Sequence, residues 1–292
     1  MLVAFLWAFN ISVVKVVFRE MEPLAFNIVR FLGASVVLLA LVRREGPMLV
    51  DRGDIGRLVL LGVIGHTLYQ TLFILGLSWT TASSAALIFG TTPIVVAVLS
   101  RIAGHERVGA RGMISIALGF AGVYLIVSRK EAGDGTAIGD LFVLGAAVCW
   151  SIYTVLAKPL LSRSSPLRIT AITLAIGTVL MIPASVPSVL RQDWASVSWL
   201  SWSGLVYSFV FALVICYVLW YRSVHSVGST RTALYSNLVP VLGSAFGVWI
   251  LGDELTTGIL LGAGCVLAGI VLMKLEIPAG LRTAAGMREP SP

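Results

Sequence analysis

The polar side chains best placed to bind a small molecule begin with His66. Tyr69, Gln70 and Phe73 follow it at the third, fourth and seventh positions, a spacing that puts all four on one face of a helix. Histidine also titrates near neutral pH, so this face could bind a ligand and carry a proton. The alternative is a histidine that is hydrogen-bonded between helices as part of their packing.

A second helical face carries aromatic groups. Trp150, Tyr153 and Thr154 lie together near the middle of an apolar stretch, where anchoring at a membrane surface cannot explain a tryptophan. Its ring offers a stacking surface and its N–H a donor, although aromatic residues also fill volume in helix bundles. Trp7, with Asn10 three residues later, repeats the pattern near the N-terminus. We expect the two faces to lie opposite each other at a substrate site.

The sequence lacks the usual arrangements for catalysis or metal binding. There is no HExxH, aspartate-rich or GxSxG pattern, and Cys149, Cys216 and Cys265 do not have the spacing of metal ligands. All 14 acidic residues fall in loops or at the ends of apolar stretches, so none is placed to bind Na⁺ or relay a proton in mid-membrane. We expect no cofactor, no metal and no enzyme, with an intramembrane enzyme as the alternative class.

The elements that hold these residues are predicted to be transmembrane helices. Of 292 residues, 58% are hydrophobic and 12% charged, and the mean hydropathy of +0.95 excludes a soluble protein. The net charge of +7 is scattered between apolar runs, so no nucleic-acid partner is expected. Because a helix needs about 20 apolar residues to cross a bilayer, the apolar stretches predict ten spans in an all-α polytopic membrane protein. They lie at 2–18, 24–42, 57–77, 82–100, 111–128, 138–158, 167–187, 203–223, 231–251 and 256–274.

The basic residues predict the orientation in the membrane. Most Lys and Arg fall in alternate loops and in the tail, and cytoplasmic loops retain such residues. Both termini are therefore expected in the cytoplasm of a bacterium, with the chain spanning the inner (plasma) membrane. Tryptophans gather at span ends on the opposite side, as in an interfacial belt: Trp79, Trp194, Trp199 and Trp202.

The chain contains an internal repeat. One constant offset superimposes Trp7 on Trp150 and Lys15 on Lys158, and a slightly larger one superimposes Pro93 on Pro240. Two halves of five spans follow, 1–130 and 135–275, with a cytoplasmic tail at 276–292. Because five is odd, the halves cross the membrane in opposite directions, an arrangement that accompanies alternating access in transporters. Duplication without such a function is the alternative.

Prolines interrupt two matched spans. Pro93 and Pro240 remove a backbone hydrogen bond within the membrane, which predicts a local bend in each span. Asn237 shares a polar helix face with Ser229 and Ser236 beside the second proline. We expect Pro93 and Pro240 to be gating positions, with static kinks as the alternative.

Other features carry weaker expectations. Lys158 and Arg30 are expected to reach toward the membrane surface, Arg30 alternatively pairing with Glu22. GxxxG spacings at Gly243–Gly247 and Gly258–Gly262 favour close helix packing within the bundle. The oligomeric state is left open, and a monomer is compatible with the sequence.

Several motifs occur in the same order in both halves. The first half has Glu22-Pro23, Arg30-Phe31, the run Thr80–Ile88 ending in Thr92-Pro93, and Gly104-His105-Glu106; the second has Val227–Pro240 and Leu251–Glu254. With these motifs the chain resembles the drug/metabolite transporter superfamily, specifically its ten-helix EamA-type exporters. The resemblance implies a metabolite exporter, with amino acids, particularly aromatic ones, and cationic toxicants among the cargoes of the family. Thr173 occupies the place of Arg30 in the second half, so no paired basic site is carried over.

The sequence thus predicts a transporter of small metabolites, most strongly amino acids, that works by alternating access. Drugs, nucleobases and other small molecules are the alternative cargoes, and a channel is a third class. The expected binding residues are His66, Tyr69, Gln70, Trp150, Tyr153, Asn237, Asn10 and Trp7. Without a mid-membrane carboxylate, transport is either passive or coupled through a histidine.

Overall fold

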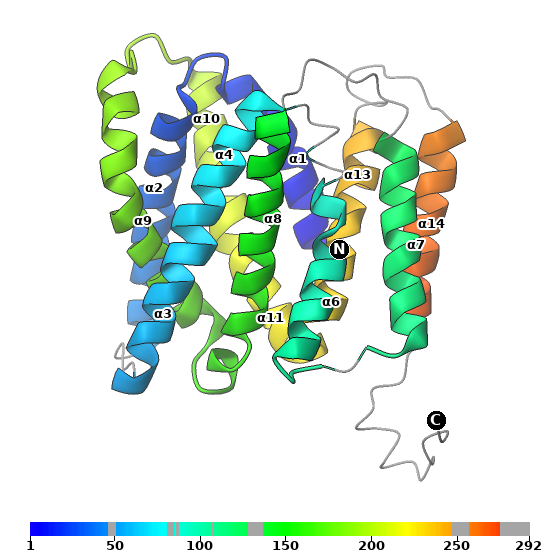
Figure 1. The fold of residues 1–292 in the computed structure, drawn as a ribbon. Coiled ribbons are helices and arrows are strands. Elements are labelled where there is room, and N and C mark those ends of the chain that lie inside the picture. The colour runs from blue at the N-terminus through cyan, green and yellow to red at the C-terminus, as the bar shows by residue number, and fades with distance from the viewer. Residues whose placement is uncertain are drawn as a thin grey trace.

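A computed structural model describes residues 1–45, 51–80, 85, 88–106, 108–127, 137–246 and 257–274, and this part of the chain is helical (Figure 1). The predicted tail at 276–292 and the junction between the halves lie outside the described residues. The first half contains α1 (Leu2–Val17), α2 (Pro23–Glu45), η1 (Arg52–Asp54), α3 (Ile55–Gly62), η2 (Val63–Leu68), α4 (Tyr69–Trp79), α6 (Thr92–Ile102) and α7 (Ala110–Val127). The second contains α8 (Ala137–Ala157), η3 (Leu160–Ser162), α9 (Pro166–Arg191), α10 (Trp199–Tyr207), η4 (Ser208–Ile215), α11 (Cys216–Val227), α12 (Ser229–Leu234), η5 (Tyr235–Asn237), α13 (Leu238–Phe246) and α14 (Thr257–Lys274).

The helices match the predicted spans. Among the described residues, five apolar helices are 23 to 29 residues long, enough to cross a membrane, and four shorter apolar helices stand beside them. The predicted span 231–251 is divided between α12, η5 and α13 in the residues that the structure describes. Large apolar side chains are exposed on the outer surfaces, as contact with lipid requires, for example Val36, Leu141, Val179 and Leu190.

Local sequence explains where several helices begin and end. Pro166 stands in the first turn of α9, and the hydroxyl of Ser165 before it accepts a hydrogen bond from the backbone N–H of Arg168. Ser198 caps α10 in the same way. Gly228 ends α11 with a φ of 94°, a left-handed conformation that favours glycine.

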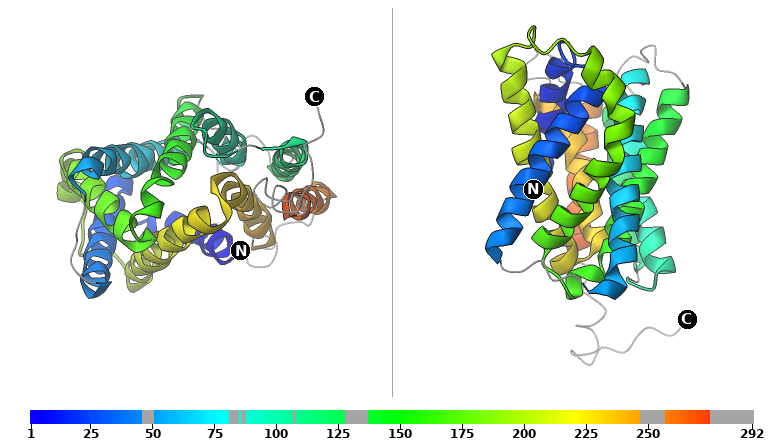
Figure 2. Two further views of the ribbon diagram at one scale, coloured as in Figure 1. Left: turned by 90° about the horizontal axis from the view of Figure 1, so that it is seen from below. Right: turned by 90° about the vertical axis from the view of Figure 1, so that its left-hand side faces the viewer.

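The chain is a polytopic all-helical protein built as two inverted five-helix repeats. The helices α1 and α8 occupy equivalent places in the two halves and run in opposite directions (Figure 1). The most extensive contacts between helices join α2 to α9 and α7 to α14, so each of these pairs contains one helix and its repeat partner (Figure 2). Small residues allow the second pair to approach closely: a Cβ on Gly122 would lie 2.5 Å from the carbonyl oxygen of Gly262.

Two matched helices contain π-helical segments, which the sequence analysis did not predict. The segment η2 (Val63–Leu68) interrupts the span formed by α3 and α4, and η4 (Ser208–Ile215) interrupts the span formed by α10 and α11. The wider turn shifts the side chains that follow it around the helix axis, and such segments are frequent at functional sites.

The predicted interruptions near the two prolines are present. A turn at Thr91 precedes α6, with Pro93 in the first turn of that helix. The 3-10 turn η5 (Tyr235–Asn237) divides α12 from α13. In a continuous helix the carbonyl of Ser236 would accept a hydrogen bond from the backbone N–H of residue 240, but Pro240 has no N–H.

Candidate functional site

A cluster of aromatic rings surrounds Trp150 of α8 in the interior of the bundle. The ring centroids of Tyr69, Tyr217, Trp220 and Trp7 lie 5.1, 5.3, 5.4 and 5.7 Å from that of Trp150. These five residues, called the aromatic cluster below, come from both halves of the chain. Their tilted and edge-to-face arrangements are the favourable ones for aromatic pairs. The cluster therefore offers stacking surfaces where the two repeats meet.

Hydrogen bonds orient two of the indole rings. The Nε1–H of Trp7 donates to the carbonyl oxygen of Ala212 at 3.0 Å, in the π-helical segment η4. The Nε1–H of Trp220 donates to the hydroxyl of Thr154 at 3.3 Å. Trp7 thus depends on the second half for its orientation.

His66 lies beside the cluster in a network of three polar side chains. Its Nε2 is 2.7 Å from the hydroxyl of Tyr153 and 3.1 Å from that of Thr173, and the two hydroxyls are 3.0 Å apart. The imidazole is fully buried, and its Nδ1 has no hydrogen-bond partner among the described residues. The His66 network therefore keeps one unused polar atom in the protein interior.

Glycines permit the close approach of helices that builds this network. A Cβ on Gly177 of α9 would lie 2.3 Å from the Cβ of His66, and a Cβ on Gly65 would lie 2.2 Å from the ring of Tyr153. A larger residue at either position would force the neighbouring side chain or helix to shift. Both glycines are thus needed where they stand so that His66 and Tyr153 can meet.

A second network surrounds Arg30 of α2. The guanidinium donates from Nε to Asn27 at 2.9 Å, from Nη1 to Ser208 at 3.1 Å and from Nη2 to Gln70 at 2.6 Å. The amide of Gln70 in turn donates to the hydroxyl of Tyr217 at 3.0 Å. Since Tyr217 belongs to the aromatic cluster, the charged group is joined to the cluster through a single side chain.

The expectation for Arg30 is wrong. Arg30 does not reach for the membrane surface and is 3% exposed, while Glu22 lies 3.6 Å from Arg191 instead. Partners from distant parts of the chain outweigh the local preference of this long basic side chain. Lys158 reaches the end of the bundle, where its ammonium lies 2.6 Å from the carboxylate of Glu106.

The predicted binding residues divide into two groups. The structure brings Trp7, Tyr69, Trp150, Gln70, His66 and Tyr153 into the cluster and its two networks. Asn237 instead lies against α7, where a Cβ on Gly119 would be 2.7 Å from its amide nitrogen. The Oδ1 atoms of Asn10 and Asn237 are buried without a hydrogen-bond partner among the described residues. Contact of these two amides with a cargo stays a prediction.

A cavity adjoins the aromatic cluster. It has a volume of about 290 Å³ and reaches from Trp7 and Trp220 to the ends of α11 and α12. Its polar lining consists of three hydroxyl-bearing side chains from the region around η5 and one from α11: Thr232, Tyr235, Ser236 and Ser223. The cavity therefore gives access to one face of the cluster.

A polar junction joins both halves at the end of the bundle where α6, α8 and α11 end. The carboxylate of Glu106 accepts hydrogen bonds from Lys158 and from the backbone N–H of Ser229 at 2.6 Å each, and from the backbone N–H of Thr230 at 3.1 Å. Burial raises the pKa of Glu106, but the hydrogen bonds from Lys158, Thr230 and Ser229 outweigh it and lower the pKa to about 2. A Cβ at Gly228 would lie 2.7 Å from this carboxylate. The Glu106 junction is thus a charged contact that holds α12 to the first half.

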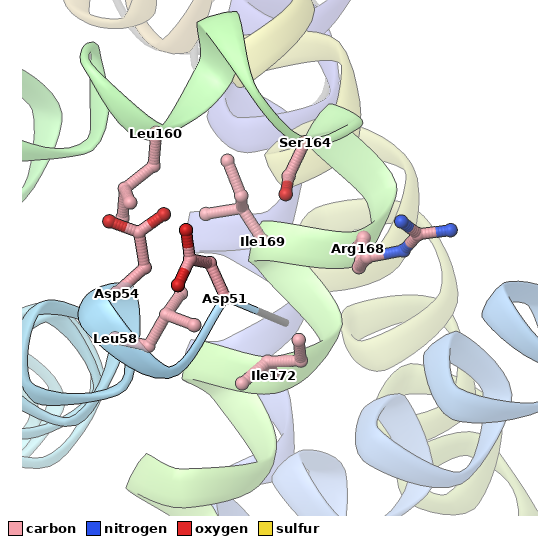
Figure 3. A pocket seen from close by; sticks show the side chains of 8 residues that line it. All are labelled: Asp51, Asp54, Leu58, Leu160, Ser164, Arg168, Ile169 and Ile172. Atoms are coloured by element: carbon pink, nitrogen blue, oxygen red, sulfur yellow. The ribbon is translucent and has the colours of Figure 1, made fainter. Parts of the chain in front are cut away.

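A smaller pocket lies at the same end of the bundle, between η1 and the start of α9 (Figure 3). Asp51 and Asp54 point into it, whereas the guanidinium of Arg168 points away. Asp54 lies 3.7 Å from Arg57 and 3.6 Å from Arg163, so its charge is already paired. Because the pocket holds about 10 Å³, it has room for about one water molecule and not for a metabolite.

The long apolar helices and the two repeats define a multi-pass membrane protein. The model of the EamA-like transporter family matches residues 1–128 and 137–275, and the chain belongs to this family. Its place in the drug/metabolite transporter superfamily, expected from the repeated motifs, is confirmed.

Similar proteins carry names of the same kind. The uncharacterized transporter YyaM of Bacillus subtilis is 27% identical over 245 residues, which cover 82% of this chain and 80% of that protein. An uncharacterized transporter of Archaeoglobus fulgidus is 28% identical over 271 residues, with 91% and 93% covered. The S-adenosylmethionine/S-adenosylhomocysteine transporter of Chlamydia trachomatis serovar D is 29% identical over 285 residues, with 94% and 87% covered. A crystal structure of a protein at 18% identity has the same fold, with a TM-score of 0.78 over 94% of each chain.

Proposed function

We propose that the protein carries small metabolites out of the cell by alternating access. Amino acids, including aromatic ones, are the favoured cargo. The aromatic cluster is the observation that supports this proposal. Five rings from both repeats meet in the interior around Trp150, with the His66 and Arg30 networks beside them. Aromatic faces bind apolar and aromatic groups, while the flanking hydroxyl and amide groups bind the polar part of an amino acid.

The inverted repeats supply the mechanism. Two similar packings related by an axis in the membrane plane give conformations of comparable energy, each open to one side. In this proposal the halves 1–130 and 135–275 rock around the aromatic cluster, and the interrupted helices near Pro93 and Pro240 bend as gates. The Glu106 junction breaks when its end of the bundle opens. The protein lies in the inner membrane of a bacterium, with both termini and the loops rich in Lys and Arg in the cytoplasm.

A nucleoside derivative that carries an amino acid is the second candidate cargo. It is favoured by the relative of 29% identity whose name gives S-adenosylmethionine and S-adenosylhomocysteine. Both molecules combine a purine ring with an amino-acid group, a combination that the cluster and its polar networks also suit. The cavity of about 290 Å³ beside Trp7 and Trp220 leaves room for a purine ring next to the aromatic cluster.

Uptake into liposomes containing the purified protein tests the proposal. The panel contains labelled phenylalanine, leucine, glutamate and S-adenosylmethionine, first at equal pH on both sides and then with an imposed proton gradient. Saturable uptake of an amino acid or of S-adenosylmethionine supports the carrier, and accumulation driven by the gradient and lost in His66→Ala assigns coupling to that residue. Absence of saturable uptake for the whole panel in a folded preparation contradicts the proposal.

A further inference from the structure

Arg30 carries a full charge in the interior of a membrane protein. The side chain is 3% exposed, although it is eight residues into α2, with the rings of Phe26 and Phe31 at 5.2 and 5.7 Å from the guanidinium carbon. A charge inside a membrane is costly and is ordinarily paired with an opposite charge or used to bind a ligand. The partners of Arg30 therefore decide which of these applies.

All the hydrogen-bond partners of Arg30 in the described part of the chain are neutral. They are the side chains of Asn27, Gln70 and Ser208. The ion pairs of the described residues lie elsewhere and leave Arg30 out. The positive charge of Arg30 is thus hydrogen-bonded, and no opposite charge lies beside it in the part of the chain that the structure describes.

The guanidinium retains donors for a ligand. It has five N–H groups, and its three hydrogen bonds use one on each nitrogen, so one N–H on Nη1 and one on Nη2 have no partner among the described residues. A guanidinium with two free donors matches the two oxygens of a carboxylate. The walls formed by Phe26 and Phe31 exclude water, which strengthens such a contact.

The two halves differ at this position, so only one of them contributes a charge to the site. Thr173 is the repeat partner of Arg30 and belongs to the neutral His66 network. A cargo at the aromatic cluster therefore meets a cation on one side chain and neutral hydroxyl and imidazole groups on the neighbouring network. No acidic side chain contacts either network among the described residues, so an ammonium group finds aromatic faces but no ion pair.

We propose that Arg30 binds the carboxylate of the cargo, so that the protein selects small carboxylates with an apolar or aromatic body over amines that lack a carboxylate. This inference rests on the proposed transport of small metabolites and names the chemical class of the cargo. Gln70 holds the guanidinium toward the aromatic cluster, because it bonds both Arg30 and Tyr217.

The test is a titration of the purified full chain in lipid nanodiscs, followed by tryptophan fluorescence, because Trp7, Trp150 and Trp220 all lie in the cluster. Three probes of matched shape separate the charges: phenylalanine, 3-phenylpropionate, which lacks the amine, and phenethylamine, which lacks the carboxylate. The proteins are the wild type, Arg30→Gln, Arg30→Lys, and the control Arg43→Gln, which removes an exposed charge from the same helix.

We expect saturable binding of phenylalanine and 3-phenylpropionate, and binding of phenethylamine at least about tenfold weaker. Arg30→Gln loses that difference, Arg30→Lys retains part of it, and Arg43→Gln behaves as wild type. If Arg30→Gln fails to fold, the comparison of the three probes on the wild type and on Arg30→Lys still decides whether Arg30 recognises the carboxylate. Equal binding of phenethylamine, or no saturable binding of either carboxylate, overturns the inference. Failure of the proposed function would instead appear as absent liposome uptake.

Discussion

Gln70 and Tyr217 occupy equivalent places in the two repeats when Pro93 is aligned with Pro240, and their side chains are hydrogen-bonded to each other at 3.0 Å. This bond therefore lies where the two halves meet, between the Arg30 network and the aromatic cluster. In the proposed mechanism, rocking of one half against the other changes the distance between these two side chains, so their contact is a place to test it.

The first prediction concerns that contact. Tyr217→Phe removes the hydroxyl and leaves the ring in the cluster. Since one hydrogen bond contributes about 1 kcal/mol, we expect a change of about fivefold in the transport rate with little change in melting temperature. Uptake of labelled phenylalanine measures the rate. An unchanged rate would show that the bond plays no part in the rate-limiting step.

The second prediction concerns Trp150, whose ring contacts four other aromatic residues of the cluster. Trp150→Ala removes the central stacking surface, and we expect uptake to fall about tenfold or more while the amount of protein in the membrane stays the same. Trp150→Phe should retain part of the activity. Trp199→Ala is the control, because Trp199 is 87% exposed. A parallel loss of uptake and of membrane protein in Trp150→Ala would reduce Trp150 to a packing residue.

The third prediction is a pH dependence at the Glu106 junction. Because the folded protein lowers the pKa of this carboxyl from 4.5 to about 2, its stabilising effect is complete above pH 4.5 and is lost as the pH falls toward 2. Glu106→Gln should therefore lower the melting temperature by a few degrees at pH 7, and the difference from wild type should shrink on acidification.

Thermal unfolding in detergent at a series of pH values measures this effect. Glu22→Gln is the matched control, since Glu22 is a partly exposed partner of Arg191 at 3.6 Å and such surface pairs contribute little. A difference between Glu106→Gln and wild type that is the same at pH 7 and pH 3 would argue against the role of the ionised carboxylate.

The fourth prediction concerns the close approach of α9 to the His66 network. Gly177→Ala places a methyl group 2.3 Å from the Cβ of His66, and the resulting overpacking should cost about 1–3 kcal/mol. The melting temperature should fall and uptake with it. Gly264→Ala in α14 serves as the control, because a Cβ there meets nothing within 4 Å. Equal stability of the two variants would show that α9 can move away without cost.

Much of the fold follows from the sequence, because charges and prolines mark the limits of membrane helices directly. The run from Leu58 to Ser100 has no Asp, Glu, Lys or Arg and is too long for one span; in the described residues α4 ends at Trp79 and α6 begins at Thr92. The helix interruptions near Pro93 and Pro240 were also predictable, since proline lacks the donor that a continuous helix needs.

The site was predictable only in part. His66, Gln70 and Trp150 stand out as polar or aromatic residues in mid-span, so their depth in the span was enough to select them. The π-helical segments η2, which contains His66, and η4 do not follow from the α-helical spacing of the sequence. The Arg30 network depends on side chains 40 and 178 residues away, which the local sequence around α2 does not specify. A charge deep in a span was nevertheless a signal that could have identified Arg30 as a functional candidate.

The most direct test of the central claim is a counterflow measurement. Liposomes containing the protein are loaded with unlabelled phenylalanine and diluted into a trace of labelled phenylalanine at equal pH on both sides. A carrier with one central site exposed to alternate sides predicts a transient accumulation of label that saturates with concentration and is lost in Arg30→Gln. A flux of label that rises linearly with concentration, without accumulation, would contradict alternating access at the aromatic cluster.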